Sequence, residues 1–158
     1  MCTSNKAQLF STDFMFALSI FLIGLTFIFV SWNDYQQKLY EEREKAAALQ
    51  KLYDVSKIWE EEGSPKRWNT TNVVSLGVVN ERSINVSKLL LLKSLGYEKV
   101  KKLLGISLYE VYFRISDKNN QTLFEFGRFP SDPEVAVKSN RICVYNSTIS
   151  LVETVVWK

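Results

Sequence analysis

The feature that most constrains this chain is residues 14–32, FMFALSIFLIGLTFIFVSW, which contain no charged side chain. As an α-helix, these 19 residues would be about 28 Å long, close to the ~30 Å hydrocarbon core of a bilayer. The run therefore predicts one membrane-spanning helix. A buried core helix is the alternative, but such a helix rarely keeps bulky apolar residues on every side.

A cleaved secretory signal is a second alternative for the same run. The apolar stretch is longer than the ~7–15 residues of a signal core, and Ser31-Trp32-Asn33-Asp34 offers no small-x-small cleavage site. We therefore expect the apolar helix to remain in the mature protein.

The charges and the glycosylation sequons disagree about which side of the membrane holds the C-terminus. Cations near the apolar run lie mostly after it, which favours a cytoplasmic C-terminus. Against this, all four Asn-x-Ser/Thr sequons come after residue 62, and such sequons are typical of surface loops of exported proteins. We expect an exterior C-terminal part whose candidate N-glycosylation residues are Asn69, Asn85, Asn120 and Asn146.

Helical periodicity continues beyond the apolar run. Residues 25–62 contain no Gly or Pro, Ser11 or Thr12 can cap the start, and Gly63-Ser64-Pro65 predicts the end. The pattern predicts one helix of about 50 residues and ~75 Å. Its second half carries an apolar stripe, which fits either a coiled coil or, as we expect, packing on the following domain. The stripe comprises Trp32, Tyr35, Leu39, Ala46, Leu49, Leu52, Val55 and Trp59.

The following domain begins with a short predicted strand at residues 73–79 and two short predicted helices. Ser87 is the predicted cap of the first helix, and Gly96 and Gly105 are the predicted C-terminal stops. The lysines of these helices fit a contact with an anionic surface, but a solvated face over a leucine-rich underside is the interpretation we favour. They are Lys88, Lys93, Lys99, Lys101 and Lys102.

From residue 108 the apolar period changes to two, which is typical of half-buried strands. Turn residues follow at 117–120, 130–133 and 146–147, and they separate four strand-like segments at 108–116, around 124–126, at 135–145 and at 149–157. Successive strands joined by short turns predict an antiparallel meander of four or five strands. The fold class is therefore α+β, a long N-terminal helix packed on a small antiparallel sheet.

Catalytic chemistry has little support in the sequence. The chain has no His and no Cys-x-x-Cys, and its two cysteines, Cys2 and Cys143, lie on opposite sides of the apolar run. It has no phosphate-binding glycine loop and no acidic metal loop. We expect no enzyme activity, no catalytic residue, no metal and no cofactor. Since the charges form no single-sign tail, we also expect no nucleic-acid partner.

The N-terminal residues resemble those of archaeal type IV pilin-like proteins with a short class III leader. The likeness rests on Lys6-Ala7-Gln8, on Ser11-Thr12-Asp13-Phe14 and on the apolar helix that follows. It implies a leader at residues 1–7 that a prepilin peptidase removes beside Gln8. It also implies a mature helix at 8–62 with its span at about 14–32, and an exterior head at 63–158.

The resemblance assigns a role in assembly to Asp13. Drawn to the bilayer centre, a carboxylate costs about 2.5–3.5 kcal/mol, and a neighbouring chain's amino-terminal ammonium would offset part of that cost. Family members place an acid fifth in the mature chain, whereas Asp13 is sixth after a cut before Gln8 and fifth after a cut before Leu9. The alternative is that Asp13 caps the helix at the headgroup level.

The function implied by the resemblance is that of a pilin-like subunit, of the minor type, in an archaeal type IV filament system. Its implied partners are the membrane, other pilin-like subunits, the prepilin peptidase, and an assembly platform with its ATPase. The implied location is the cell membrane, crossed once, with a cytoplasmic N-terminus, an exterior head and passage into an extracellular filament. The alternative is a single-pass anchored surface protein with a small binding head that does not polymerise.

Overall fold

The computed structural model describes the backbone of residues 5–158 and the side chains of residues 12–158. It divides into two compact units, Met1–Arg43 and Glu44–Lys158, and we call the second unit the head. The long helix α1, Asn5–Ser56, contributes to both units and continues as a 3-10 turn, η1, at Lys57–Trp59.

The predicted long helix is confirmed, but its ends differ from the prediction. Helix α1 begins at Asn5, so Ser11 and Thr12 lie inside the helix and not at its start. It ends at Ser56 and not at residue 62, because the 3-10 turn closes with a bond from Glu60 N to Lys57 O (2.9 Å). The chain therefore leaves the helix before the predicted stop at residues 63–65.

Within the head, α1 buries one face. Ala48 and Val55 are fully buried, and Leu52 and Trp59 are nearly so. Packing of the helix on the following domain is therefore confirmed. The predicted stripe is wrong at Ala46 and Leu49, which are exposed, because the buried face passes through Ala48 instead.

The indole of Trp59 fixes the end of the helix against the sheet. Its Nε1 donates a buried hydrogen bond to Thr154 Oγ1 (2.9 Å), and its ring meets Phe113 edge to face at 5.3 Å. The aromatic contact alone contributes about 0.5–1.5 kcal/mol beyond the buried area. A single side chain thus ties η1 to two strands that follow it by more than 50 residues.

The predicted strand at 73–79 is wrong. Val74 is 72% exposed, and residues 73–78 pair only through a bridge between Ser64 and Ser75, so that only the last residue of the predicted segment, Val79, lies in a strand. Local strand propensity loses here to close backbone packing, since a Cβ at Gly77 would overlap the backbone of Glu61. The regular pairing that follows is a small hairpin of β1 (Val79–Asn80) and β2 (Ser83–Ile84).

The two short helices are confirmed as α2 (Val86–Leu95) and α3 (Tyr97–Leu104). The cap of α2 is Asn85 and not Ser87, because Asn85 Oδ1 accepts the hydrogen bond from Lys88 N (3.2 Å). Gly96 and Gly105 end the helices as predicted, with φ of 78° and 66°.

The remaining strands are β3 (Glu110–Ser116), β4 (Thr122–Gly127), β5 (Ala136–Tyr145) and β6 (Thr148–Trp157). The six-stranded sheet has the order β1-β2-β5-β6-β3-β4, and β2 pairs with β5 in parallel while the other pairs are antiparallel.

The predicted meander is therefore wrong. The C-terminal strand β6 lies between β5 and β3, and β4 is an edge strand. Strand β6 carries the buried residues Val152, Val155 and Val156, and strands this apolar are favoured at the centre of a sheet. Chain order alone does not reveal this preference.

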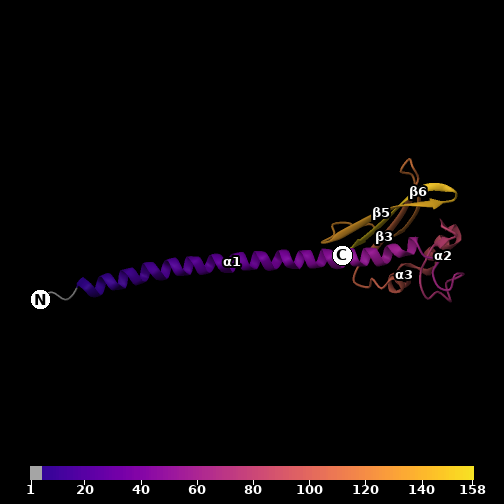
Figure 1. Cartoon of the computed structure of the whole chain (residues 1–158). Coiled ribbons are helices and arrows are strands. Elements are labelled where there is room, and N and C mark those ends of the chain that lie inside the picture. Colours follow the sequence, from indigo (N-terminus) through magenta and orange to yellow (C-terminus); the bar gives the residue numbers. More distant parts are fainter. Residues whose placement is uncertain (1–4) are drawn as a thin grey trace. The chain divides into compact units, whose positions relative to one another are not determined.

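One hydrophobic core joins α1, α2, α3 and the sheet. Figure 1 shows β3, β5 and β6 along the last turns of α1, with α2 and α3 near the same turns. The fully buried members with the largest side chains are Trp68, Phe113, Ile58, Leu89, Leu92, Ile106 and Ile115.

Candidate functional site

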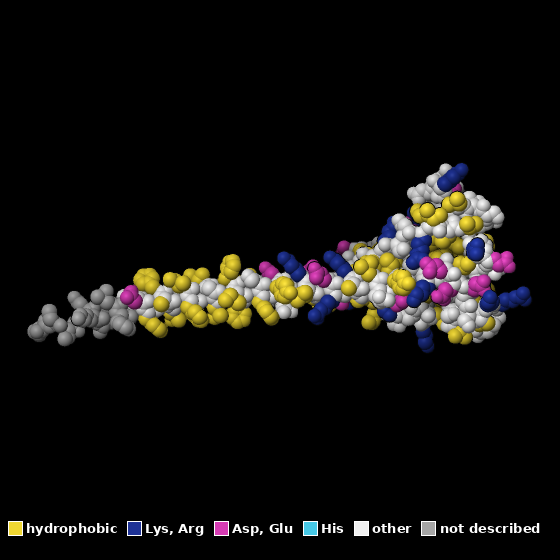
Figure 2. Space-filling view, viewed as in Figure 1, with side chains coloured by type: hydrophobic (Ala, Val, Ile, Leu, Met, Phe, Trp, Pro, Cys, Tyr) yellow, Lys and Arg dark blue, Asp and Glu magenta, His cyan; other side chains and the backbone are white. Residues whose placement is uncertain are grey.

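The apolar part of α1 is the first candidate. Among the described residues, α1 is the one helix long and apolar enough to cross a membrane, and none of its apolar window is buried. Every side chain at 12–38 is exposed, and Figure 2 shows apolar side chains along this segment. The core-helix alternative is therefore wrong, because a core helix would be largely buried. The segment fits a single-pass membrane anchor.

Two hydroxyl groups inside this segment are satisfied without water. Ser19 Oγ donates to Met15 O, and Thr26 Oγ1 donates to Leu22 O, each at 2.8 Å. A bilayer core supplies no hydrogen-bond partners, so an unsatisfied hydroxyl there would be costly. These bonds along the helix remove that cost for Ser19 and Thr26, which lie in the middle of the run.

Aromatic residues stand at the end of the apolar run. Trp32 and Tyr35 are 60% and 58% exposed, and Asp34 and Lys38 begin the charged part of α1. Trp and Tyr prefer the membrane–water interface, because their rings are apolar and their N–H or O–H groups are polar. The change from apolar to charged residues thus coincides with an interfacial aromatic pair.

Asp13 lies eight residues after the start of α1, so it does not cap this helix. It is exposed and immediately precedes the apolar run. The side chains of the proposed cleavage residues Lys6, Ala7 and Gln8 lie outside those described, and only their helical backbone is defined.

The four sequons occupy different environments. Asn69, Asn120 and Asn146 are exposed, whereas Asn85 is half-buried and its amide oxygen caps α2. In the first sequon, Thr71 Oγ1 donates to Asn69 Oδ1 (2.7 Å). Three of the sequons are therefore accessible for modification, and the fourth has a structural role.

The lysines of α2 and α3 do not form one face. Lys88 and Lys101 are each 8% exposed, so the predicted solvated face is wrong for these two. Lys88 Nζ donates to Glu62 O (2.6 Å) and Val79 O (3.0 Å). Burial lowers the pKa of Lys88, and the nearby Glu62 carboxylate opposes that effect. Sequence analysis missed the burial of both lysines, because the groups that bind them lie in other segments of the head.

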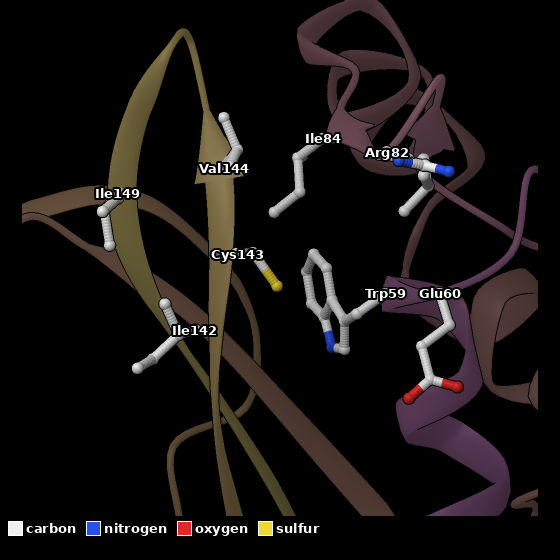
Figure 3. A pocket seen from close by; sticks show the side chains of 9 residues that line it. Trp59, Glu60, Arg82, Ile84, Ile142, Cys143, Val144 and Ile149 are labelled. Atoms are coloured by element: carbon white, nitrogen blue, oxygen red, sulfur yellow. The ribbon is translucent and has the colours of Figure 1, made fainter.

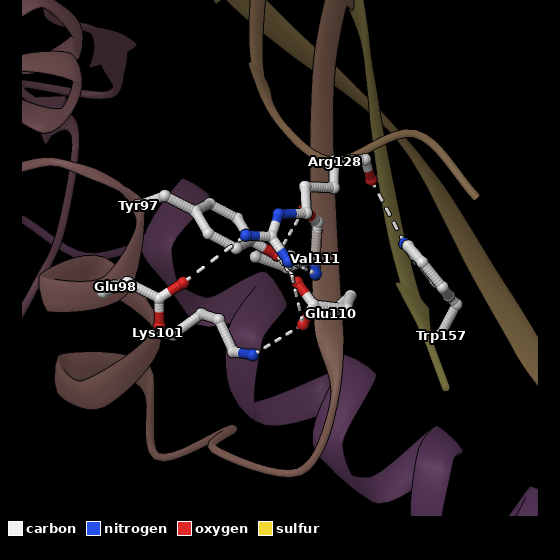
Figure 4. A network of polar contacts seen from close by, with 7 residues as sticks. All are labelled: Tyr97, Glu98, Lys101, Glu110, Val111, Arg128 and Trp157. Carbon is white, nitrogen blue, oxygen red and sulfur yellow. Dashed lines mark hydrogen bonds and ion pairs between the residues drawn. The ribbon is translucent and has the colours of Figure 1, made fainter. Parts of the chain in front are cut away.

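A polar cluster joins α3 to β3 (Figure 4). The Tyr97 hydroxyl donates to Glu110 Oε2 and accepts from Val111 N (3.0 Å). Lys101 Nζ binds Glu110 Oε1 at 2.9 Å, and Arg128 Nη1 lies 3.6 Å from the same oxygen. Each polar group that the cluster buries has a hydrogen-bond or ion-pair partner within it. We call these residues the clamp, because they hold α3 against β3.

The clamp shifts the protonation of its members. Burial and the hydrogen bond to Glu110 raise the pKa of Tyr97 above its usual range. Burial alone would raise the pKa of Glu110, but the hydrogen bonds from Tyr97 and Lys101 outweigh it and lower that pKa. Glu110 is therefore an anion and Tyr97 a neutral donor at neutral pH.

The described part of the chain contains no group of three or more His, Cys, Asp or Glu side chains that could hold a metal ion. The acidic residues 60–62 do not form a site either. Glu60 pairs with Arg141, and Glu62 pairs with Lys66 at 3.2 Å.

No protein family model, no curated protein and no solved structure matches this chain.

Proposed function

We propose that this protein is a pilin-like subunit, of the minor type, of an archaeal type IV filament system. The observation that carries the proposal is the exposed apolar segment of α1 with Asp13 immediately before it. An exposed helix of this kind needs lipid or other apolar helices around it. The head would lie outside the cell and act by contact, without catalysis.

Asp13 supports assembly in register. It lies inside a helix, so it does not serve as a cap for the uncleaved chain. Its carboxylate would be offset in a bundle of helices by the new amino terminus of a neighbouring chain. The partners in this proposal are the prepilin peptidase, the assembly platform with its ATPase, and other pilin-like subunits.

The first test is the N-terminal sequence of the mature protein, recovered from membranes of cells that express the full chain. A start at Gln8 or Leu9 is the expected result. An intact chain that begins at Met1 would overturn the proposal and favour an anchored surface protein that does not polymerise. A topology reporter fused after Lys158 tests the exterior head independently.

The second test compares Asp13→Ala with Asp34→Ala, an exposed carboxylate on the same helix beyond the apolar run. We expect the Asp13→Ala protein to be missing from filaments sheared from the cells. The Asp13→Glu and Asp34→Ala proteins should be present in them. N-terminal sequencing of each variant separates a failure of processing from a failure of assembly. Normal processing and normal entry of Asp13→Ala into filaments would disprove the pairing role.

A further inference from the structure

Strand β5 has a long edge without a strand partner. It pairs with β6 at all ten of its residues, from Ala136 to Tyr145, but on its other side β2 pairs with Tyr145 alone. Among the described strands, the remaining nine residues have no neighbour on that side. Free edges of this length present rows of main-chain donors and acceptors and are usually protected.

Two of the usual protections, proline and unpaired charge, are absent from β5. The strand contains no proline, and its two cations are neutralised within the head. Lys138 pairs with Glu153 at 2.8 Å, and Arg141 pairs with Glu60. The charges of the strand therefore do little to repel an incoming chain.

A pocket of about 520 Å³ lies against this edge, where the β1–β2 hairpin separates from β5 (Figure 3). Three consecutive residues of β5, Ile142, Cys143 and Val144, line it. Val79, Arg82 and Ile84 of the hairpin line the side that faces β5, so the pocket occupies the gap between the hairpin and the strand, and Ile149 of β6 lines it as well. The volume is in the range of ligand-binding clefts.

The other walls of the pocket are apolar and fixed. They include the indole of Trp59, whose Nε1 is already bonded to Thr154, and the side chains of Val79 and Ile84. Burial raises the pKa of the Cys143 thiol, which keeps it neutral and makes it another weakly polar wall.

One charge in the lining is not neutralised. Glu60 is paired with Arg141, whereas Arg82 makes no ion pair and no hydrogen bond with the described residues. Arg82 and Glu81 form the hairpin turn, both with positive φ (70° and 47°), a conformation that costs free energy for residues other than glycine. The turn thus holds a free guanidinium at an apolar pocket beside an open strand edge.

The geometry points to a binding site for an extended peptide segment that adds a strand to the free edge of β5, with an apolar side chain in the Trp59 pocket and an acidic side chain on Arg82. Main-chain hydrogen bonds to β5 would supply affinity, and the pocket and Arg82 would supply specificity. The site lies wholly in the head and does not depend on assembly of α1.

The probe is a random peptide library displayed on phage and selected on the immobilised full-length protein in detergent micelles. We expect enrichment of peptides that combine one apolar and one acidic residue at a fixed spacing. Arg82→Glu should replace the acidic preference with a basic one. Lys118→Glu makes the same charge change at an exposed turn between β3 and β4, and it should leave the selected sequences unchanged.

The best peptide is then synthesised and titrated. We expect binding about tenfold weaker to Arg82→Gly, which keeps the turn because glycine accepts positive φ. Backbone N-methylation at alternate peptide positions should abolish binding if the peptide forms a strand. Failure to enrich any motif, indifference to Arg82, or undiminished binding of the N-methylated peptide would each overturn the proposal. Equally tight binding of octanoate would overturn it in favour of a small-molecule pocket.

Discussion

Removal of one oxygen atom, in Tyr97→Phe, should destabilise the head strongly. The hydroxyl donates to the Glu110 carboxylate and accepts from Val111 N, and Val111 is fully buried. A hydrogen bond to a charged group contributes about 1.5–3 kcal/mol, and a buried donor left without a partner costs about 1–3 kcal/mol. We therefore expect a loss of about 3 kcal/mol in the free energy of unfolding.

For a head of roughly 115 residues, that loss corresponds to a fall in Tm of about 12 °C. The assay is thermal and urea unfolding of the full-length protein in detergent micelles, followed by near-UV circular dichroism. Tyr109→Phe is the matched control, because it removes a hydroxyl that makes no hydrogen bond with the described residues. The control should lose little stability.

The same clamp predicts a pH dependence. The pKa of Glu110 is lower in the folded head than its ordinary value of 4.5, so its contribution is fully present above pH 4.5. The contribution decreases as the pH falls through the lower folded-state pKa. Glu110→Gln and Tyr97→Phe should therefore each reduce the loss of stability on acidification. A Tyr97→Phe variant that unfolds like the wild type, with the same pH profile, would refute the reasoning.

Three other substitutions test the rest of the head by the same unfolding assay. Lys88→Met should cost about 2 kcal/mol, because the two carbonyl oxygens that the ammonium reaches, on the half-buried residues Glu62 and Val79, lose this donor. Gly77→Ala should prevent native packing of its loop, whereas Gly24→Ala, in open space on α1, should leave the head unchanged. Asn85→Ala should cost about 1 kcal/mol through loss of the α2 cap, and Asn119→Ala at an exposed turn should cost less, because the Asn119 side chain makes no hydrogen bond with the described residues.

Local patterns predicted α2, α3 and the strands β3 to β6, but not the β1–β2 hairpin. Alternation of apolar and polar residues predicted β3, and turn residues predicted the break between β5 and β6. Gly96 and Gly105 predicted the ends of α2 and α3, because both adopt positive φ. These signals depend on a few neighbouring residues, so they need no knowledge of the rest of the fold.

The pairing of the elements could not be predicted in the same way. Nothing local distinguishes the observed order, with β6 between β5 and β3, from a meander. The choice is made by burial of the whole sheet, which favours the most apolar strand at its centre. The cap of α2 illustrates the limit on a smaller scale. Asn85 and Ser87 are both good caps by type, and only the backbone conformation selects Asn85.

The candidate sites show the same division. The exposed apolar segment of α1 could be read from 19 residues, whereas the pocket beside β5 requires three segments from different parts of the chain. The excess of Lys and Arg over Asp and Glu after residue 62 did not indicate where the pocket lies. A lysine reads the same in a sequence whether it is solvated or, like Lys101, buried in an ion pair with Glu110.

A cation attracts a binding partner under two conditions. No group of the fold already holds or neutralises the cation, and its surroundings lower the desolvation cost of forming the complex. Lys88 fails this condition because carbonyl oxygens hold its ammonium, and Arg141 fails it because Glu60 neutralises it. Arg82 meets the condition, since it lies at an apolar pocket and makes no ion pair with the described residues. The strained turn that presents it therefore has a physical reason to retain arginine where glycine would be less strained.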